Sequence, residues 1–166
     1  MYTIISGTNR IGSHTEKIAN QYQQILKAKG IDVKIFFLKN LNVLEKNPDF
    51  NKAEKEFLIP AQKFIFIMPE YNGTYPGVLK AMIDISDLKL SWWYKKALLV
   101  GISTGRAGNL RGMDHMTAIL NHIKMIVHPN KLPISTIDKV MDENGTISNK
   151  STLHAIDTQI DEFINF

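Results

Sequence analysis

Short, almost wholly apolar runs are the feature that most limits how this chain can fold. Residues 64–68 contain no polar side chain, and residues 97–102 interrupt their aliphatic side chains only with Gly101. Strands of this composition are covered on both faces, as strands of parallel sheets are. Segments with helical spacing of apolar residues separate the runs, and parallel neighbours require such crossovers. The sequence therefore predicts an α/β fold with a parallel sheet.

Strands and helices alternate along the whole chain, with no repeat, linker or second domain. We expect the 166 residues, 1–166, to form a single domain. Ligands of open α/β sheets bind outside the carboxyl ends of the strands, so the loops that follow the strands are the candidate site. The expected strands are 2–6, 31–38, 64–68, 96–102 and one within 126–134; the expected helices are 14–30, 51–59, 78–88, 113–125 and 153–164, with a tight turn at 144–145.

Composition narrows the class of protein further. The chain has no cysteine, which excludes disulfides, a thiol nucleophile and thiolate metal sites. We see no basic segment followed by a long apolar stretch at the start, and no apolar run near the ~18 residues of a membrane span, so we expect a cytoplasmic protein. The net charge of +4 comes from scattered basic residues. This pattern is typical of a solvated surface, and we expect no nucleic-acid or membrane partner.

The loop after the first strand carries the features of a phosphate site. Glycines allow a sharp turn into a helix, whose first N–H groups bind anions. Arg10 adds a forked cation, and Thr8, Ser13 and Thr15 add hydroxyl donors. The simpler interpretation is a capped helix, with Ser13 or Thr15 as the N-cap.

The spacing of this loop limits which phosphate it fits. Gly7 and Gly12 have the separation of a nucleoside-triphosphatase loop, but Ser13 and His14 follow where that loop needs lysine and a hydroxyl residue. Asn9 stands where a dinucleotide fingerprint has its second glycine. A hydroxyl-rich pocket for a monophosphate remains, which favours a mononucleotide such as FMN.

The loops after the third and fourth strands complete the candidate site. Residues 69–80 contain two prolines and two glycines, which fix an irregular backbone whose polar groups suit the edge of a planar heterocycle, with Tyr71 or Tyr75 over one face. A generic turn before a helix is the alternative. Residues 103–112 form a Gly-rich loop at the same edge, which by itself is equally compatible with a plain surface loop.

Residues 69–73 and 76–81 closely resemble the flavin-contact segment of the NADPH-dependent FMN reductase family, which includes quinone, chromate and azo-dye reductases. The loop with Gly7, Thr8, Arg10, Ser13 and Thr15 resembles the phosphate loop of that family, and residues 103–111 resemble its Gly-rich loop beside the isoalloxazine ring. The resemblance covers about residues 1–135.

Four positions depart from the family pattern. Serine is commoner at Thr8, and asparagine at Thr15, but both replacements keep a polar side chain. Asn109 follows Gly108 where the family has paired glycines, and asparagine tolerates left-handed backbone. Asp84 lies between two isoleucines, where the family often has Asp-Trp.

The resemblance implies a flavodoxin-like three-layer sandwich with a five-stranded parallel sheet of order 2-1-3-4-5. It implies bound FMN, NADPH or NADH as the electron donor, and a quinone, flavin, azo compound or metal oxyanion as the acceptor. It also implies a homodimer or homotetramer. The helix that starts near Val78 and residues 90–94 agree, since we expect their large apolar groups to lie close to the cofactor loops.

The family's roles are carried over residue by residue. The phosphate is expected at Gly7, Thr8, Asn9, Arg10, Ser13, His14 and Thr15; the ring at Pro69, Glu70, Tyr71, Asn72 and Gly73; and the other edge of the ring at Ser103, Thr104, Gly105 and Arg106. No catalytic side chain is assigned, because hydride transfer to a flavin needs no protein acid in its first half. Glu70 is as compatible with a structural role, such as a subunit contact, as with a catalytic one.

Two other functions remain open. A flavodoxin-type electron carrier would share the fold, but such carriers are typically strongly acidic. A non-catalytic module would use the fold for protein contact alone. His115 and His122 are seven residues apart on one expected helix, about 10 Å along its axis, so one metal cannot join them. Trp92 and Trp93 are expected to be core or interface aromatics.

Overall fold

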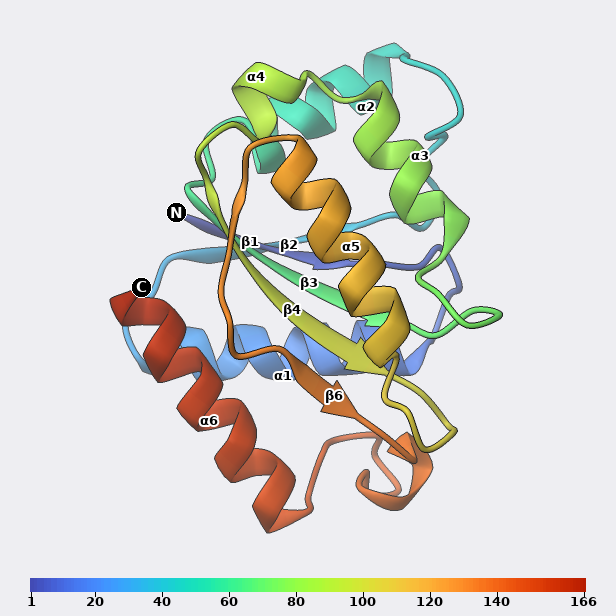
Figure 1. Cartoon of the computed structure of the whole chain (residues 1–166), viewed down its shortest axis with the longest axis vertical. Helices are drawn as coiled ribbons and strands as arrows, with labels where there is room; N and C mark the ends of the chain where they lie inside the picture. The colour runs from blue at the N-terminus through green and yellow to red at the C-terminus, as the bar shows by residue number, and fades with distance from the viewer.

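A parallel β-sheet covered by helices on both faces forms the whole molecule (Figure 1), and the computed structural model describes residues 1–166. The strands are β1 (Tyr2–Ser6), β2 (Val33–Phe37), β3 (Lys63–Pro69), β4 (Lys96–Ile102), β5 (Ile126–Val127) and β6 (Leu132–Ile134). The helices are α1 (His14–Ala28), α2 (Pro48–Ala53), the π-helical η1 (Glu54–Leu58), α3 (Gly77–Ile85), α4 (Leu88–Ser91), α5 (Leu110–His122), the 3-10 helix η2 (Ile137–Lys139) and α6 (Lys150–Asn165).

The strand order β2-β1-β3-β4-β5 confirms the predicted flavodoxin-like topology. The fifth strand position within 126–134 is confirmed, but it is divided in two, because β5 and β6 both pair with β4 and are separated by residues 128–131. Pro129 lies in this gap and has no N–H to donate to a neighbouring strand. The amide of the fully buried Gln159 instead donates to the carbonyls of Leu99 and Asn130, at 3.2 and 2.8 Å.

Two hydrophobic clusters fill the layers above and below the sheet. Along β3, Ile65 and Ile67 pack toward α1 and α6, whereas Phe64, Phe66 and Met68 pack toward α3 and α5. Successive side chains of a strand point to opposite faces, so an uninterrupted apolar strand serves both clusters. This explains why β3 and β4 lack the alternation of polar and apolar residues.

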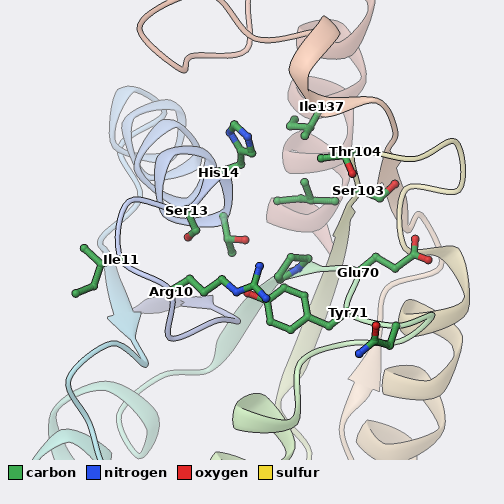
Figure 2. Close-up of a pocket in the computed structure, with 13 residues that line it drawn as sticks. Arg10, Ile11, Ser13, His14, Glu70, Tyr71, Ser103, Thr104 and Ile137 are labelled. Carbon is green, nitrogen blue, oxygen red and sulfur yellow. The ribbon is translucent and has the colours of Figure 1, made fainter.

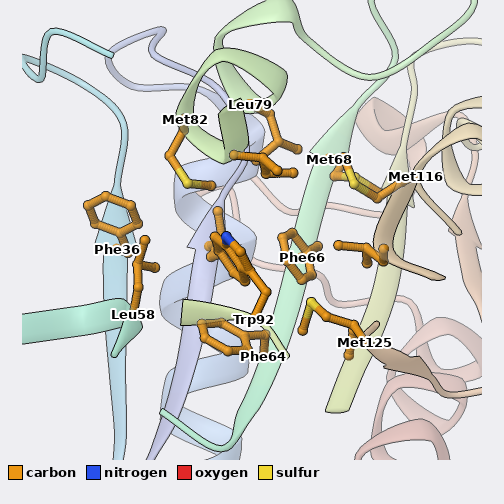
Figure 3. Close-up of a cluster of buried hydrophobic side chains, with 14 of the residues drawn as sticks. Phe36, Leu58, Phe64, Phe66, Met68, Leu79, Met82, Trp92, Met116 and Met125 are labelled. Carbon is orange, nitrogen blue, oxygen red and sulfur yellow. The ribbon is translucent and has the colours of Figure 1, made fainter. Parts of the chain in front are cut away.

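Trp92 is the largest side chain of the cluster on the α3 and α5 side of the sheet, and it is fully buried (Figure 3). Its ring lies 5.0 Å from that of Phe64 and 6.1 Å from that of Phe66, and its indole N–H donates to Ser86 Oγ. This confirms a core role for Trp92. The expectation that residues 90–94 lie close to the cofactor loops is wrong, because they precede β4 and therefore lie at the amino edge of the sheet.

Local capping explains where the predicted helices differ from the observed ones. The helix expected to run to residue 88 ends at Ile85, because Asp87 caps a new helix by accepting a hydrogen bond from the Leu90 N–H at 2.9 Å. The turn at 144–145 is confirmed, with Gly145 at φ +77° beside a bridge between Met141 and Ile147.

No helix combines the length and the apolar composition needed to cross a lipid bilayer.

Gly101 allows the loop after β4 to approach the sheet closely. A Cβ at this position would lie 2.1 Å from the carbonyl oxygen of Gly108. Because that contact is with backbone, Gly101→Ala should lower the free energy of unfolding by about 1–3 kcal/mol, measured by urea denaturation.

Gly105→Ala is the matched control, since a Cβ at Gly105 meets no atom within 4 Å. This variant should change the free energy of unfolding by less than about 0.5 kcal/mol. Equal losses in the two variants would contradict the role of close packing at Gly101.

Candidate functional site

The loops after β1, β3 and β4 meet at the carboxyl edge of the sheet around a cavity of about 440 Å³ (Figure 2). Ten of the predicted site residues line this cavity: Arg10, Ser13, His14, Thr15, Pro69, Glu70, Tyr71, Asn72, Ser103 and Thr104. The other six, which lie in the same loops without lining it, are Gly7, Thr8, Asn9, Gly73, Gly105 and Arg106. The size is that of a small-molecule site.

The β1 loop is held against β3 before it enters α1. The Gly7 N–H donates to the carbonyl of Ile67 at 2.9 Å, and a Cβ on Gly7 would lie 2.8 Å from that same oxygen. Ser13 is the N-cap of α1, because its Oγ accepts the N–H of Glu16 at 3.2 Å. The capping role that the sequence left open is therefore real, and it leaves the side chain of the buried Thr15 free of that task.

The first turn of α1 carries little uncompensated negative charge. Glu16 lies in this turn and pairs with Lys39. The hydrogen bond from Lys39 lowers the pKa of the Glu16 carboxyl below its usual value, and a weaker contribution comes from the Gly12 N–H. Because Lys39 neutralises this carboxylate, the positive end of the helix dipole remains available to an anion in the cavity.

Tyr71 links the β1 and β3 loops. Its hydroxyl lies 2.7 Å from Thr8 Oγ1, and the Arg10 guanidinium lies over its ring at 4.2 Å from the centroid, as Figure 2 shows. Tyr71 therefore lines the cavity beside the β1 loop. Tyr75, the other aromatic candidate, instead packs against the core and does not line the cavity.

The β3 loop makes a tight turn from Tyr71 to Thr74. The backbone N–H of each of these residues donates to the carbonyl of the other, at 2.8 and 3.2 Å. Asn72 and Gly73 have φ values of +51° and +81°, as the two central residues of a type I′ turn require. The Asn-Gly pair is the usual sequence signal for a type I′ turn, so this turn was predictable from the sequence.

The Gly-rich loop folds on Ser103 and Asn109. Ser103 Oγ donates to the Gly105 carbonyl and accepts the Gly108 N–H, both at 2.9 Å. Asn109 has φ +59°, which confirms that asparagine adopts the left-handed backbone here. Its amide donates to the carbonyls of Met68 and Pro69 at 3.1 Å and so ties this loop to the end of β3.

A fourth wall of the cavity comes from a segment that the sequence motifs did not reveal. Ile137 lines the cavity, and its N–H donates to the Ser103 carbonyl at 3.0 Å. The Thr136 N–H donates to the Gly105 carbonyl at 2.8 Å, and Asp138 pairs with His14 at 3.1 Å. The one sequence signal for this wall is that residues 136–138 follow the last strand, because a segment that follows a parallel strand starts at the carboxyl edge of the sheet.

Sequence comparison relates this chain to a family of reductases. The sequence model of the family described as NADPH-dependent FMN reductase matches residues 2–138. A 2-hydroxy-1,4-benzoquinone reductase from Burkholderia sp is 24% identical over 120 residues, which cover 70% of this chain and 66% of that protein, slightly less than two thirds of its length. An FMN-dependent NADPH-azoreductase from Staphylococcus aureus is 27% identical over 155 residues, covering 86% of this chain and 81% of that protein.

A solved structure gives the same fold. The flavoenzyme NAD(P)H:(acceptor) oxidoreductase FerB from Paracoccus denitrificans superposes with a TM-score of 0.77 at 20% identity. The match covers 99% of this chain and 94% of that one. At this identity the likeness establishes a shared fold.

Proposed function

The chain belongs to the NADPH-dependent FMN reductase family, and from this premise we propose that it takes hydride from NADPH or NADH onto bound FMN. A quinone, flavin, azo compound or metal oxyanion then receives the electrons. The observation that carries this proposal is a single cavity with an anion-binding end on α1 and an end on the β3 and Gly-rich loops that suits a planar ring.

The residues at the α1 end fit a phosphate. The proposed phosphate ligands are the residues that the family resemblance indicated: Gly7, Thr8, Asn9, Arg10, Ser13, His14 and Thr15. The first N–H groups of α1 and the Arg10 guanidinium supply donors and positive charge. The Nδ1 atom of His14 is buried and has no hydrogen-bond partner in the protein, which supports a ligand group at this end.

The opposite end of the cavity fits the isoalloxazine ring. We assign Pro69, Glu70, Tyr71, Asn72 and Gly73 to one side of the ring, and Ser103, Thr104, Gly105 and Arg106 to its other edge. Their backbone is held by hydrogen bonds within the protein, such as that from the Glu70 N–H to the Ile102 carbonyl at 2.8 Å. Ile102 and Ile137 add apolar surface to the cavity.

These contacts assign a separate role to each part of the site. FMN supplies the hydride-accepting chemistry when it is bound. Arg10 and the start of α1 fix one end of the ligand, and the turn from Tyr71 to Thr74 and the Ser103 loop orient the other. No side chain is assigned as a proton donor, and we propose that Glu70, which lines the cavity, positions the β3 loop.

Direct reduction by a nicotinamide nucleotide separates this function from that of an electron carrier. We expect the FMN-loaded protein to be bleached in one turnover by NADPH or NADH, followed as flavin absorbance in a stopped-flow instrument. A flavodoxin-type carrier requires a partner protein and would stay oxidised. A protein that takes up no FMN and gains no thermal stability from it would favour the non-catalytic module instead.

The proposed phosphate contact gives a second prediction. Arg10→Ala removes a charge-assisted contact worth roughly 1.5–3 kcal/mol, so FMN affinity should fall by about one to two orders of magnitude. Riboflavin lacks the phosphate and should bind the wild type and the variant almost equally, as fluorescence titration can measure. An equal loss for both ligands would mean that Arg10 supports the loop through Tyr71.

We also propose that the chain forms a homodimer or homotetramer. A groove between α3 and α5, of about 430 Å³, has an apolar lining that includes Ile83, Ile119 and Ile123. Leu88 at its edge is 44% exposed. Light scattering at micromolar concentration should give at least twice the chain mass of 18.9 kDa, and a mass near 18.9 kDa would contradict this proposal.

A further inference from the structure

The side chain of Tyr71 contacts the β1 loop, although its backbone belongs to the ring end of the cavity. Its hydroxyl lies 2.7 Å from Thr8 Oγ1, and the Cζ atom of Arg10 lies 4.2 Å from the centroid of its ring (Figure 2). Arg10 lines the cavity and is the arginine of the proposed phosphate site. One side chain from the β3 loop therefore contacts the cation that we assign to the phosphate.

Both ends of Tyr71 are fixed within the protein. Its backbone N–H and carbonyl form the two hydrogen bonds of the turn with Thr74, at 2.8 and 3.2 Å. Its hydroxyl, at the far end of the ring, is tied to Thr8, which is 3% exposed and does not line the cavity. Within the proposed phosphate site, the Thr8 hydroxyl thus anchors Tyr71 and reaches the ligand only through other residues.

The ring of Tyr71 is the one group that holds the Arg10 guanidinium. None of the eight ion pairs includes Arg10, and the only hydrogen bond that this residue donates comes from its backbone N–H. Glu70 lines the same cavity but forms no ion pair, and Glu16 in the first turn of α1 pairs with Lys39. No carboxylate of the protein therefore orients this cation.

A guanidinium held by an aromatic ring is well suited to bind a phosphate. The cation–π contact uses the face of the ring and none of the five N–H donors of arginine, so the whole fork remains available to phosphate oxygens. A free arginine side chain loses rotamer freedom when it binds, and one that already lies against a ring loses less. The gain in affinity applies only to a ligand that carries a phosphate.

We propose that Tyr71, anchored by Thr8, positions the Arg10 guanidinium for the phosphate of FMN and so makes the site prefer FMN over riboflavin. The inference rests on the proposed function, because it requires FMN in the cavity. The family resemblance places Tyr71 at the ring. The contacts keep its backbone there and give its side chain a task at the opposite end of the cavity.

The ratio of FMN affinity to riboflavin affinity tests this role, because the two flavins share the ring and differ in the phosphate. Both are titrated by flavin fluorescence into wild type, Tyr71→Phe and Tyr71→Leu. Tyr71→Phe loses the anchor and keeps the ring, so the ratio should fall by about two- to tenfold. Tyr71→Leu also loses the ring under Arg10, and the ratio should fall by about five- to fiftyfold.

A double-mutant cycle shows whether Tyr71 acts through Arg10. In the Arg10→Ala background, Tyr71→Leu should leave the ratio unchanged, because no guanidinium remains to be positioned. Losses that add fully in the double variant would mean that Tyr71 meets the phosphate by itself, and would overturn the proposal. Equal weakening of both flavins by Tyr71→Phe and Tyr71→Leu would overturn it too, since Tyr71 would then serve only the ring.

Tyr75→Phe is the matched control, because it removes the hydroxyl of the other tyrosine in this loop. Tyr75 packs against the core and does not line the cavity, so this variant should keep the wild-type ratio. A wild type that binds FMN and riboflavin equally well would also overturn the proposal. A wild type that binds neither flavin would instead refute the proposed function, so the two failures are distinguishable.

Discussion

The pairing of β3 with β4 is the constraint on which the rest of the structure depends. Seven successive residue pairs join them, from Lys63 with Lys96 to Pro69 with Ile102, so both strands end at the same level. The loops that follow are therefore within hydrogen-bond reach of each other, and Asn109 joins them directly. The two strands are parallel and buried on both faces, so helical crossovers return the chain to the amino edge of the sheet each time. The loops that follow the strands therefore gather at the carboxyl edge.

The cavity walls are held together by protein contacts rather than by a ligand. Tyr71 joins the β1 loop to the β3 loop, and Ser103 joins the Gly-rich loop to the segment at Ile137. Such contacts reduce the conformational entropy that the loops would lose when a ligand binds. This lower entropic cost is the usual source of affinity in a preorganised site. Of the two buried side-chain atoms left without a hydrogen-bond partner, His14 Nδ1 belongs to a residue that lines the cavity, whereas Asn109 Oδ1 does not.

Sequence reasoning succeeded where a local pattern decides the structure. Apolar runs predicted β3 and β4, and the polar loop before α1 predicted the start of that helix at His14. It failed where a distant contact decides. The gap after β5 depends on Gln159 from α6, and the wall at Ile137 depends on backbone bonds to the Ser103 loop. Residues 90–94 were misplaced because apolar composition does not say at which edge of the sheet a segment lies.

The wall at Ile137 is held by its main chain, and this has a consequence for how the pocket diversifies. The N–H groups of Thr136 and Ile137 bond to carbonyls of the Gly-rich loop, and these bonds need no particular side chain at position 137, proline excepted. The Ile137 side chain, by contrast, is 1% exposed and packs in the core cluster with Ile134 and Ile147 while it also lines the cavity, so only apolar side chains of similar volume can replace it. Exchange among such side chains alters the shape of the pocket, and the range of molecules it admits, at a cost in folding stability of usually less than about 1.5 kcal/mol.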